Sequence, residues 1–320
     1  MLADTLHRAA IHEKGEAAAI ELAEQLVRTA NRLGMQRCYA LMQVSDHRDD
    51  YDAQLRSLMV QQGKVQHAVE LEPLPREFWP SLLELQLDRG VDAAINAILA
   101  AMAVVDGENE ALIGGRTHRV AGWMFTALSA SSMSRRIRDS ALRYCASDKR
   151  RKWLRFYDPL VADFYWQVLA ASQREALLSD IRGWAWLDRW GSLAVASVPS
   201  VHRIATTAFS ASQWEALDAV APLNQAWIRA RSERLSVEPS QLLDALKTTI
   251  AGLRQGLHTR ADTDLFAWHA LVLGPDFYRR EPYRSALQEG LAAGQRYCRI
   301  ARDWQATTSH AQKASTAWAT

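Results

Sequence analysis

The chain has 320 residues, a length that favours two packed units over one hydrophobic core. Its residues are 48% hydrophobic and 23% charged, which excludes disorder throughout the chain. With only 15 Gly and 9 Pro, the composition favours helices and argues against an all-β sandwich or a collagen-like rod. The formal net charge of +2 provides no overall attraction to nucleic acid or to membranes.

The N-terminal sequence and the cysteines bear on the compartment. Glu and His interrupt the first residues too early for the apolar core of a signal peptide, and the longest apolar stretch, 93–105, falls short of the roughly 20 residues that span a bilayer. Cys38, Cys145 and Cys298 are far apart and lie in apolar segments, which indicates core residues rather than a disulfide framework. We expect a cytoplasmic protein.

The first third of the chain alternates helical and strand patterns. In chain order the sequence predicts a helix at 4–33 stopped by Gly34, a strand buried on both faces at 37–44, a short helix at 51–61, a half-buried strand at 65–71 and, after three prolines, helical structure at 81–105. His67 falls on the apolar face of its strand, where a core histidine is the better interpretation than a catalytic base.

The middle of the chain predicts a βαβ unit. Residues 120–128 and 152–157 have strand patterns and residues 131–146 a helical one, so we expect two parallel strands joined by a right-handed crossover. Asp158 followed by a proline is typical of the start of a further helix. Two short strands, 183–188 and 193–198, complete the expected sheet.

After residue 200 only amphipathic helices are predicted, at 212–235, 242–257, 264–273 and 285–304. The expected fold is therefore an α/β N-terminal lobe, with a mixed sheet, flanking helices and at least one βαβ unit, followed by an all-α C-terminal lobe. The expected parts are an N-terminal helix at 1–36, an α/β domain at 37–200, a helical lobe at 205–305 and a flexible tail at 306–320.

Catalytic motifs are missing from the sequence. It contains no phosphate-binding glycine loop, no GxSxG elbow and no pair of histidines spaced as metal ligands on a helix. Asp262 and Asp264 precede an apolar helix and are better explained as N-terminal caps than as a metal pair, and His269 lies in the middle of that helix. We predict no catalytic residue, no metal, no cofactor and no enzymatic activity.

One segment carries a strong local charge. Residues 135–155 contain nine Lys or Arg and two Asp, a net of +7, so the rest of the chain carries −5. Its candidate binding residues are Arg135, Arg136, Arg143, Lys149, Arg150 and Arg151. Three interpretations stay open: a solvated helix face with an Arg135, Asp139, Arg143 ion-pair ladder, an acidic partner protein, or phosphate and nucleic acid.

The connection between the last helices has the composition of a protein interface. Tyr and Arg, which are frequent at interface hot spots, are concentrated in it. The candidate partner-binding residues there are Phe277, Tyr278, Arg279, Arg280 and Tyr283. The alternative is that this connection packs against its own domain.

The RFYDP segment at 155–159 carries a resemblance to a known family. Together with several other segments, it makes the chain resemble the effector adaptor or chaperone proteins of bacterial type VI secretion, the domain-of-unknown-function family 4123. Those segments are the strand beginning at Cys38, the Gly122-Trp-Met-Phe-Thr strand, the Arg-rich helix after it and the Ile181-Arg-Gly-Trp-Ala-Trp-Leu segment. The resemblance covers residues 37 to about 190, and the stretch from Asp264 to Phe277 looks like the helical region that often follows. The N-terminal helix is longer than the family pattern.

The resemblance implies a non-enzymatic adaptor in the bacterial cytoplasm that binds a toxin effector and helps to load it onto a VgrG-type spike, with no membrane partner. The candidate partner contacts in this segment are Arg155, Tyr157 and Asp158, although a role in the fold is the first interpretation. In that interpretation Arg155 and Tyr157 lie on one strand face and Phe156 on the other. Asp158 caps the next helix and pairs with Arg155. The alternative function is an anion- or nucleic-acid-binding module that uses residues 135–155.

Overall fold

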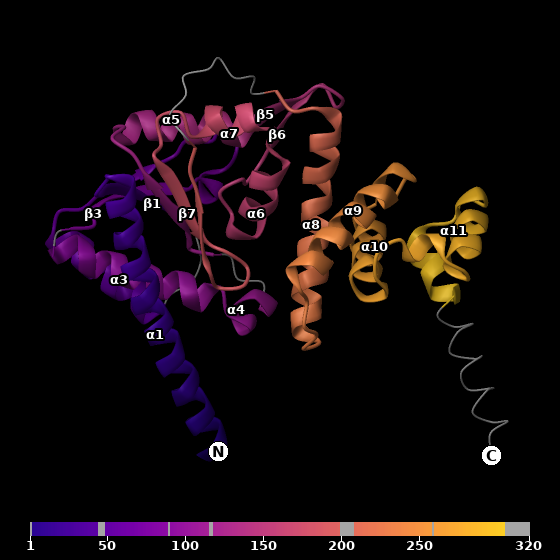
Figure 1. Cartoon of the computed structure of the whole chain (residues 1–320), viewed down its shortest axis with the longest axis horizontal. Helices are drawn as coiled ribbons and strands as arrows, with labels where there is room; N and C mark the ends of the chain where they lie inside the picture. The colour runs from indigo at the N-terminus through magenta and orange to yellow at the C-terminus, as the bar shows by residue number, and fades with distance from the viewer. Residues whose placement is uncertain are drawn as a thin grey trace. The chain divides into compact units, whose positions relative to one another are not determined.

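The computed structural model describes residues 2–43, 49–88, 90–114, 118–198, 208–257 and 259–304. The chain divides into two compact units, Met1–Ser210 and Ala211–Thr320, which we call the sheet unit and the helical unit (Figure 1). An α/β lobe followed by a helical lobe, as predicted, is confirmed. The predicted tail at 306–320 lies outside the described residues.

The sheet unit contains two sheets and their flanking helices. Its elements are α1 (Leu2–Leu33), β1 (Arg37–Met42), α2 (Asp50–Gln61), β2 (Gln66–Ala68), the 3-10 helix η1 (Arg76–Phe78), β3 (Ser81–Gln86), α3 (Gly90–Asp106), α4 (Asn109–Ile113), β4 (Val120–Phe125), α5 (Ala130–Ala141), β5 (Leu142–Cys145), β6 (Arg150–Trp153), α6 (Pro159–Val168), α7 (Ala171–Leu177), β7 (Gly183–Leu187) and β8 (Leu193–Ala196).

The main sheet has the strand order β2-β3-β1-β4-β7-β8, and each neighbouring pair is antiparallel. The predicted βαβ unit is therefore wrong. Residues 150–153 do not return to the sheet beside β4 but pair with β5 in a separate antiparallel ribbon. The helix α5 ends at Ala141, and the chain then forms a hairpin rather than a crossover.

Helices cover both faces of this sheet. On one face, Trp123 and Phe125 of β4 pack in a core with Leu26 of α1 and Leu99 of α3. On the other face, Met124 lies with residues of α5 and α7. Because adjacent residues of β4 are buried on opposite faces, all six are buried, and the strand has no polar alternation. Figure 1 shows α5 and α7 together on the side of the sheet away from α1 and α3.

Local signals explain several boundaries. Gly34, with φ of 62°, ends α1, and Asp49 caps α2 through a hydrogen bond accepted from the Asp52 backbone N–H. The segment predicted to be helical from residue 81 instead begins with β3, because Leu82, Leu83 and Leu85 fill both faces of the sheet. His67 is also corrected: it is exposed on β2, the terminal strand, and is not a core histidine.

Gly122 is the glycine on which the sheet depends most. Its φ of 147° lies outside the range that other residues adopt readily, and a Cβ there would stand 2.4 Å from the carbonyl oxygen of Ala185 on β7. The register of β1 against β4 shifts beside it, between Leu41 and Met42. Glycine therefore permits the close approach of β4 and β7.

The helical unit consists of packed helices and an aromatic core. Its elements are α8 (Ala211–Ser232), α9 (Pro239–Arg254), α10 (Arg260–Leu273), the 3-10 helix η2 (Phe277–Arg279), α11 (Tyr283–Ala292) and helical residues 297–304. Phe266 of α10 contacts the rings of Phe277 at 5.0 Å and Tyr297 at 5.1 Å. Among the helices that the structure describes, none has both the length and the apolar character needed to cross a membrane.

Candidate partner-binding surface

The basic segment 135–155 extends over α5, β5 and β6, so its charges do not share one helix face. Arg135, Lys149, Arg150 and Arg151 are exposed, whereas Arg136 and Arg143 are partly buried. The predicted ion-pair ladder is wrong, because α5 ends before Arg143 and the carboxylate of Asp139 lies 3.7 Å from Arg138 instead.

Arg136 ties α5 to the end of α7. Its guanidinium donates to the carbonyl of Ala176 at 3.0 Å and to the hydroxyl of Ser179 at 2.9 Å, and it pairs with the carboxylate of Asp180. These bonds engage the side chain within the sheet unit. Arg136 is thus a structural residue of the basic segment rather than a free cation.

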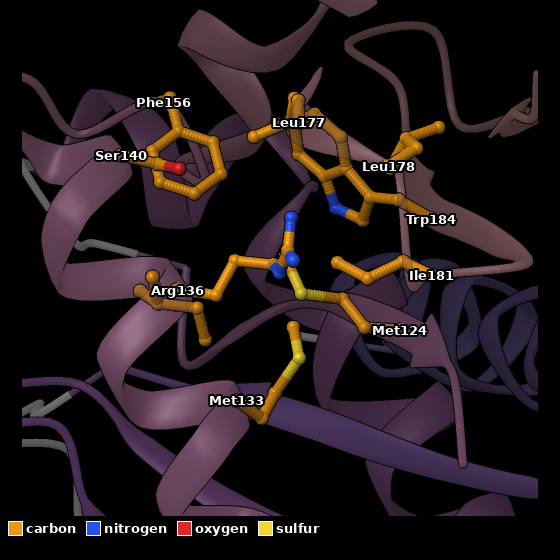
Figure 2. Close-up of a pocket in the computed structure, with 10 residues that line it drawn as sticks. Met124, Met133, Arg136, Ser140, Phe156, Leu177, Leu178, Ile181 and Trp184 are labelled. Carbon is orange, nitrogen blue, oxygen red and sulfur yellow. The ribbon is translucent and has the colours of Figure 1, made fainter. Parts of the chain in front are cut away.

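A small cavity lies beneath Arg136, between α5, α7 and the sheet (Figure 2). Its volume of about 10 Å³ is room for one water molecule. Figure 2 shows the Trp184 indole nitrogen and the Arg136 guanidinium on the cavity side, beside Met124 and Met133. The Trp184 Nε1 atom is buried and has no hydrogen-bond partner among the described residues. The cavity can hold a bound water but no substrate.

The β5–β6 ribbon presents the most exposed cations of this segment. Tyr144, 60% exposed, lies opposite Arg151 in the ribbon register. The turn between the strands contains Lys149 in the left-handed region at φ of 52°, and Asp148 pairs there with Lys152 at 2.9 Å. The ribbon therefore combines an exposed tyrosine with exposed arginines, the residue types that are enriched at protein interfaces.

The RFYDP segment forms a turn after β6, so its predicted strand faces are wrong. Phe156 and Tyr157 are both 1% exposed, and Phe156 contacts the ring of Trp184 at 5.7 Å. Burial raises the pKa of Tyr157 to about 12, so its hydroxyl stays protonated. These side chains lie in the core of the sheet unit, where they are not available for direct contact with a partner.

The two charged residues of RFYDP pair with each other and Asp158 caps the next helix, as the sequence predicted, although they do so in a turn and not at the end of a strand. Arg155 pairs with Asp158 at 3.0 Å and also donates to the side chain of Gln43, which follows β1. Asp158 accepts a hydrogen bond from the backbone N–H of Leu160 and so caps α6. The segment thereby attaches the end of the ribbon to the main sheet.

A buried charge cluster around Arg119 was not predicted. Arg119, 2% exposed, donates to Asp106 from Nη2 at 2.9 Å and from Nη1 to Asp49 at 2.8 Å and Asp52 at 2.9 Å. Burial alone would lower the pKa of Arg119, but these hydrogen bonds outweigh it and raise the pKa above its ordinary value. The cluster joins the first turn of α2 to the end of α3. It binds its own carboxylates and leaves no open donor fork for a ligand.

His118, next to Arg119, is also buried. Burial lowers its pKa, against the opposing effect of Asp158 and Asp106. The imidazole is therefore neutral at pH 7. Sequence reasoning does not find this environment, because the carboxylates that act on His118 come from other parts of the chain.

The predicted partner residues of the helical unit divide into core and surface. Phe277 is fully buried and Tyr278 is 7% exposed, so both belong to the aromatic core, as the alternative interpretation expected. Tyr283 is half-buried and contacts Trp304 at 4.9 Å. Arg279 and Arg280 are exposed. Of the five candidate residues in this connection, Arg279 and Arg280 are therefore the two that extend into solvent outside the core.

His269 and Asp262 have structural partners in this unit. His269 Nδ1 lies 2.7 Å from the hydroxyl of Tyr297, and burial lowers its pKa to about 4, assisted by the charge of Arg229. Asp262 accepts from the backbone N–H of Cys298 at 2.9 Å, and Thr259 rather than Asp262 caps α10.

The described residues offer no metal centre: within them, no three His, Cys, Asp or Glu side chains are grouped so as to hold an ion. Comparison of the chain with protein-family models, with curated proteins and with solved structures gives no match.

Proposed function

We propose that this chain is a non-enzymatic adaptor that binds a type VI secretion toxin effector in the bacterial cytoplasm and helps to load it onto a VgrG-type spike. The observation that carries the proposal is the exposed β5–β6 ribbon, which combines Tyr144 and Arg151 and leads directly into the RFYDP turn. That turn is also the segment on which the resemblance to the adaptor family rests.

The attachment of the ribbon suits a binding surface. Arg155, shortly after the end of β6, donates a hydrogen bond to the side chain of Gln43, and the ring of Phe156 packs on that of Trp184 in β7. The base of the ribbon is therefore attached to the main sheet at two points. A surface that is ordered before binding loses less conformational entropy when the partner arrives. The ribbon charge favours an acidic patch on the partner, which would also increase the association rate.

Co-expression with the toxin encoded beside this chain tests the proposal. We expect the toxin to be soluble and secreted only when the chain is present, and to co-purify with it. The double variant Arg150→Glu with Arg151→Glu should reduce co-purification at least tenfold. The matched control, Arg260→Glu with Arg299→Glu, makes the same charge change at exposed residues of the helical unit and should leave binding unchanged.

A toxin that is equally soluble and equally secreted without the chain would refute the adaptor. Equal loss of binding in both double variants would show that net charge matters and that the ribbon is not the contact.

A second candidate function, nucleic-acid binding, is favoured by the three adjacent exposed cations Lys149, Arg150 and Arg151. It predicts retention on duplex DNA that weakens steeply with salt, since each neutralised phosphate releases counterions. Retention that is weak at low salt, or insensitive to salt, would exclude it.

A further inference from the structure

A polar groove of about 570 Å³ lies between β2 and α5, apart from the ribbon surface. The exposed residues of β2 form one wall. The other wall consists of Ser131, Ser134, Arg135 and Arg138 of α5. None of these residues was singled out as a site by the sequence except Arg135.

The helix wall is one continuous face of α5. Positions 131, 134, 135 and 138 follow the i, i+3, i+4, i+7 spacing that places residues on one side of a helix. Met133 and Ile137 occupy the other side and are buried in the core. The core contacts of α5 thus fix the orientation of the two serines and two arginines toward the groove.

The strand wall is the free edge of the main sheet. The backbone N–H of Val69 donates to the carbonyl of Pro80 at 2.8 Å, so these opposed residues form a hydrogen-bonded pair. Because hydrogen-bonded and non-hydrogen-bonded pairs alternate in an antiparallel ladder, Gln66 and Ala68 direct their backbone N–H and C=O groups away from β3. An extended chain can pair with those groups.

The groove charge favours an acidic occupant. Arg135 has no carboxylate partner among the described residues, and the nearest carboxylate to Arg138, that of Asp139, is a weak exposed contact at 3.7 Å. The remaining lining includes the imidazole of His67 and a single carboxylate, that of Glu70. Two arginines are therefore available to a ligand.

We propose that this groove binds an acidic segment of a partner protein, which adds to the sheet as a strand beside β2. The proposal rests on the adaptor function, and it names a second contact besides the ribbon. Side chains at alternate positions of a strand are about 7 Å apart on one face, and residues three apart on a helix are about 5–6 Å apart. A segment with Asp or Glu at alternate positions therefore matches the spacing of Arg135 and Arg138.

A protein segment fits this site better than a nucleic acid. The edge of β2 offers alternating backbone donors and acceptors, which another peptide backbone satisfies and a phosphodiester does not. Glu70 would repel a continuous run of phosphates, whereas an acidic peptide can place a neutral or basic residue there.

Fluorescence anisotropy with the purified full-length chain tests the groove. The probe is a labelled peptide of alternating glutamate and valine, and the control peptide has lysine in place of glutamate. Arg135→Glu with Arg138→Glu should weaken binding of the glutamate peptide at least tenfold. Ala68→Pro should do so too, because it removes an outward-facing N–H but no bond of the β2–β3 ladder.

The ribbon variant Arg150→Glu with Arg151→Glu is the matched control and should bind the peptide like the wild type. Absence of peptide binding at about 1 mM, or equal weakening by the ribbon variant, overturns the proposal. So does binding that Ala68→Pro leaves unchanged, since strand addition requires the edge N–H. Single-stranded DNA that displaces the peptide, with affinity unaffected by Ala68→Pro, would assign the groove to nucleic acid. These results are independent of the co-expression experiment, so either proposal can fail alone.

Discussion

The buried charge cluster predicts a large and specific loss of stability in Arg119→Leu. Among the residues that the structure describes, Arg119 is the cation that pairs with Asp106, Asp49 and Asp52, and the carboxylate of Asp106 is 2% exposed. Leucine would remove every guanidinium bond to that carboxylate and leave it buried without a countercharge, with only the backbone N–H of residue 119 still donating to it at 2.7 Å. Removal of one member of a buried pair destabilises a protein by about 3–5 kcal/mol, a large part of a typical 5–15 kcal/mol total.

Urea unfolding measures this loss. The matched control is Arg28→Leu, which breaks an exposed pair with Glu24 at 3.3 Å and should change the free energy of unfolding by less than about 1 kcal/mol. The double variant Arg119→Leu with Asp106→Leu should recover part of the lost stability, because no buried carboxylate then lacks its partner. A loss in Arg119→Leu as small as the control, or a double variant no more stable than the single one, would refute the reasoning.

Three further predictions concern stability. Gly122→Ala should lower the free energy of unfolding in urea by about 3 kcal/mol or more, because the new Cβ meets the Ala185 carbonyl oxygen. Its control, Gly63→Ala, is at φ of 60° with nothing within 4 Å of the new Cβ and should lose only about 1–2 kcal/mol. Equal losses in the two variants would contradict the close approach of β4 and β7. The pKa of His269 is about 4 in the folded state, so between pH 6.5 and 4 the unfolded chain binds a proton at His269 that the folded chain does not, and stability falls by about 3 kcal/mol as pH drops through that window. His269→Gln should lack this part of the pH dependence. An equal slope of unfolding free energy against pH in the variant and the wild type would disprove the prediction. Burial would raise the pKa of Asp262, but its hydrogen bonds lower the pKa to about 2. Asp262→Asn should therefore lose about 2 kcal/mol of stability above pH 4 and progressively less below it. A loss that is constant with pH would argue against ionisation of Asp262 as the cause.

The sequence predicted those elements whose local signals agree with their final environment. The strand β1 was recognised from an unbroken apolar run, and helices cover both of its faces. The start of α6 was recognised because Asp158 and the following proline are sufficient, without distant contacts, to favour a helix N-terminus. In these cases the residues that determine the structure lie within a few positions of one another.

The errors arose where a short apolar run suits two structures. The β3 segment SLLELQ is rich in helix-forming residues, and only its place between β2 and β1 makes it a strand. The helix α5 was predicted to continue to residue 146 because apolar residues persist through β5, and the turn that ends this pattern contains Lys149 rather than glycine. Because lysine rarely adopts the left-handed conformation, its presence at position 149 does not predict a turn from the sequence.

The candidate surface was predicted in part. Its charge was evident from the spacing of Lys and Arg, but which cations are free depends on partners that are remote in sequence: Asp180 for Arg136, and Gln43 for Arg155. The Arg119 cluster was missed for the same reason, since Asp49 and Asp106 precede it by 70 and 13 positions. Phe277 resembled an interface residue because aromatic cores and interfaces share a composition.

The strands β4 and β7 are hydrogen-bonded neighbours, yet residues 126–182 separate them along the chain. That insertion contains α5, the ribbon and the RFYDP turn, and so it holds the ribbon surface and the helix wall of the groove, whereas the strand wall, β2, lies outside it. Because β4 and β7 are antiparallel, a short hairpin could connect them equally well. The sequence of residues 126–182 can therefore vary without a change in the strand order of the sheet. Homologues that serve different cargoes should therefore differ most within this insertion, and exchange of the insertion between two such proteins should transfer cargo choice while the scaffold stays intact.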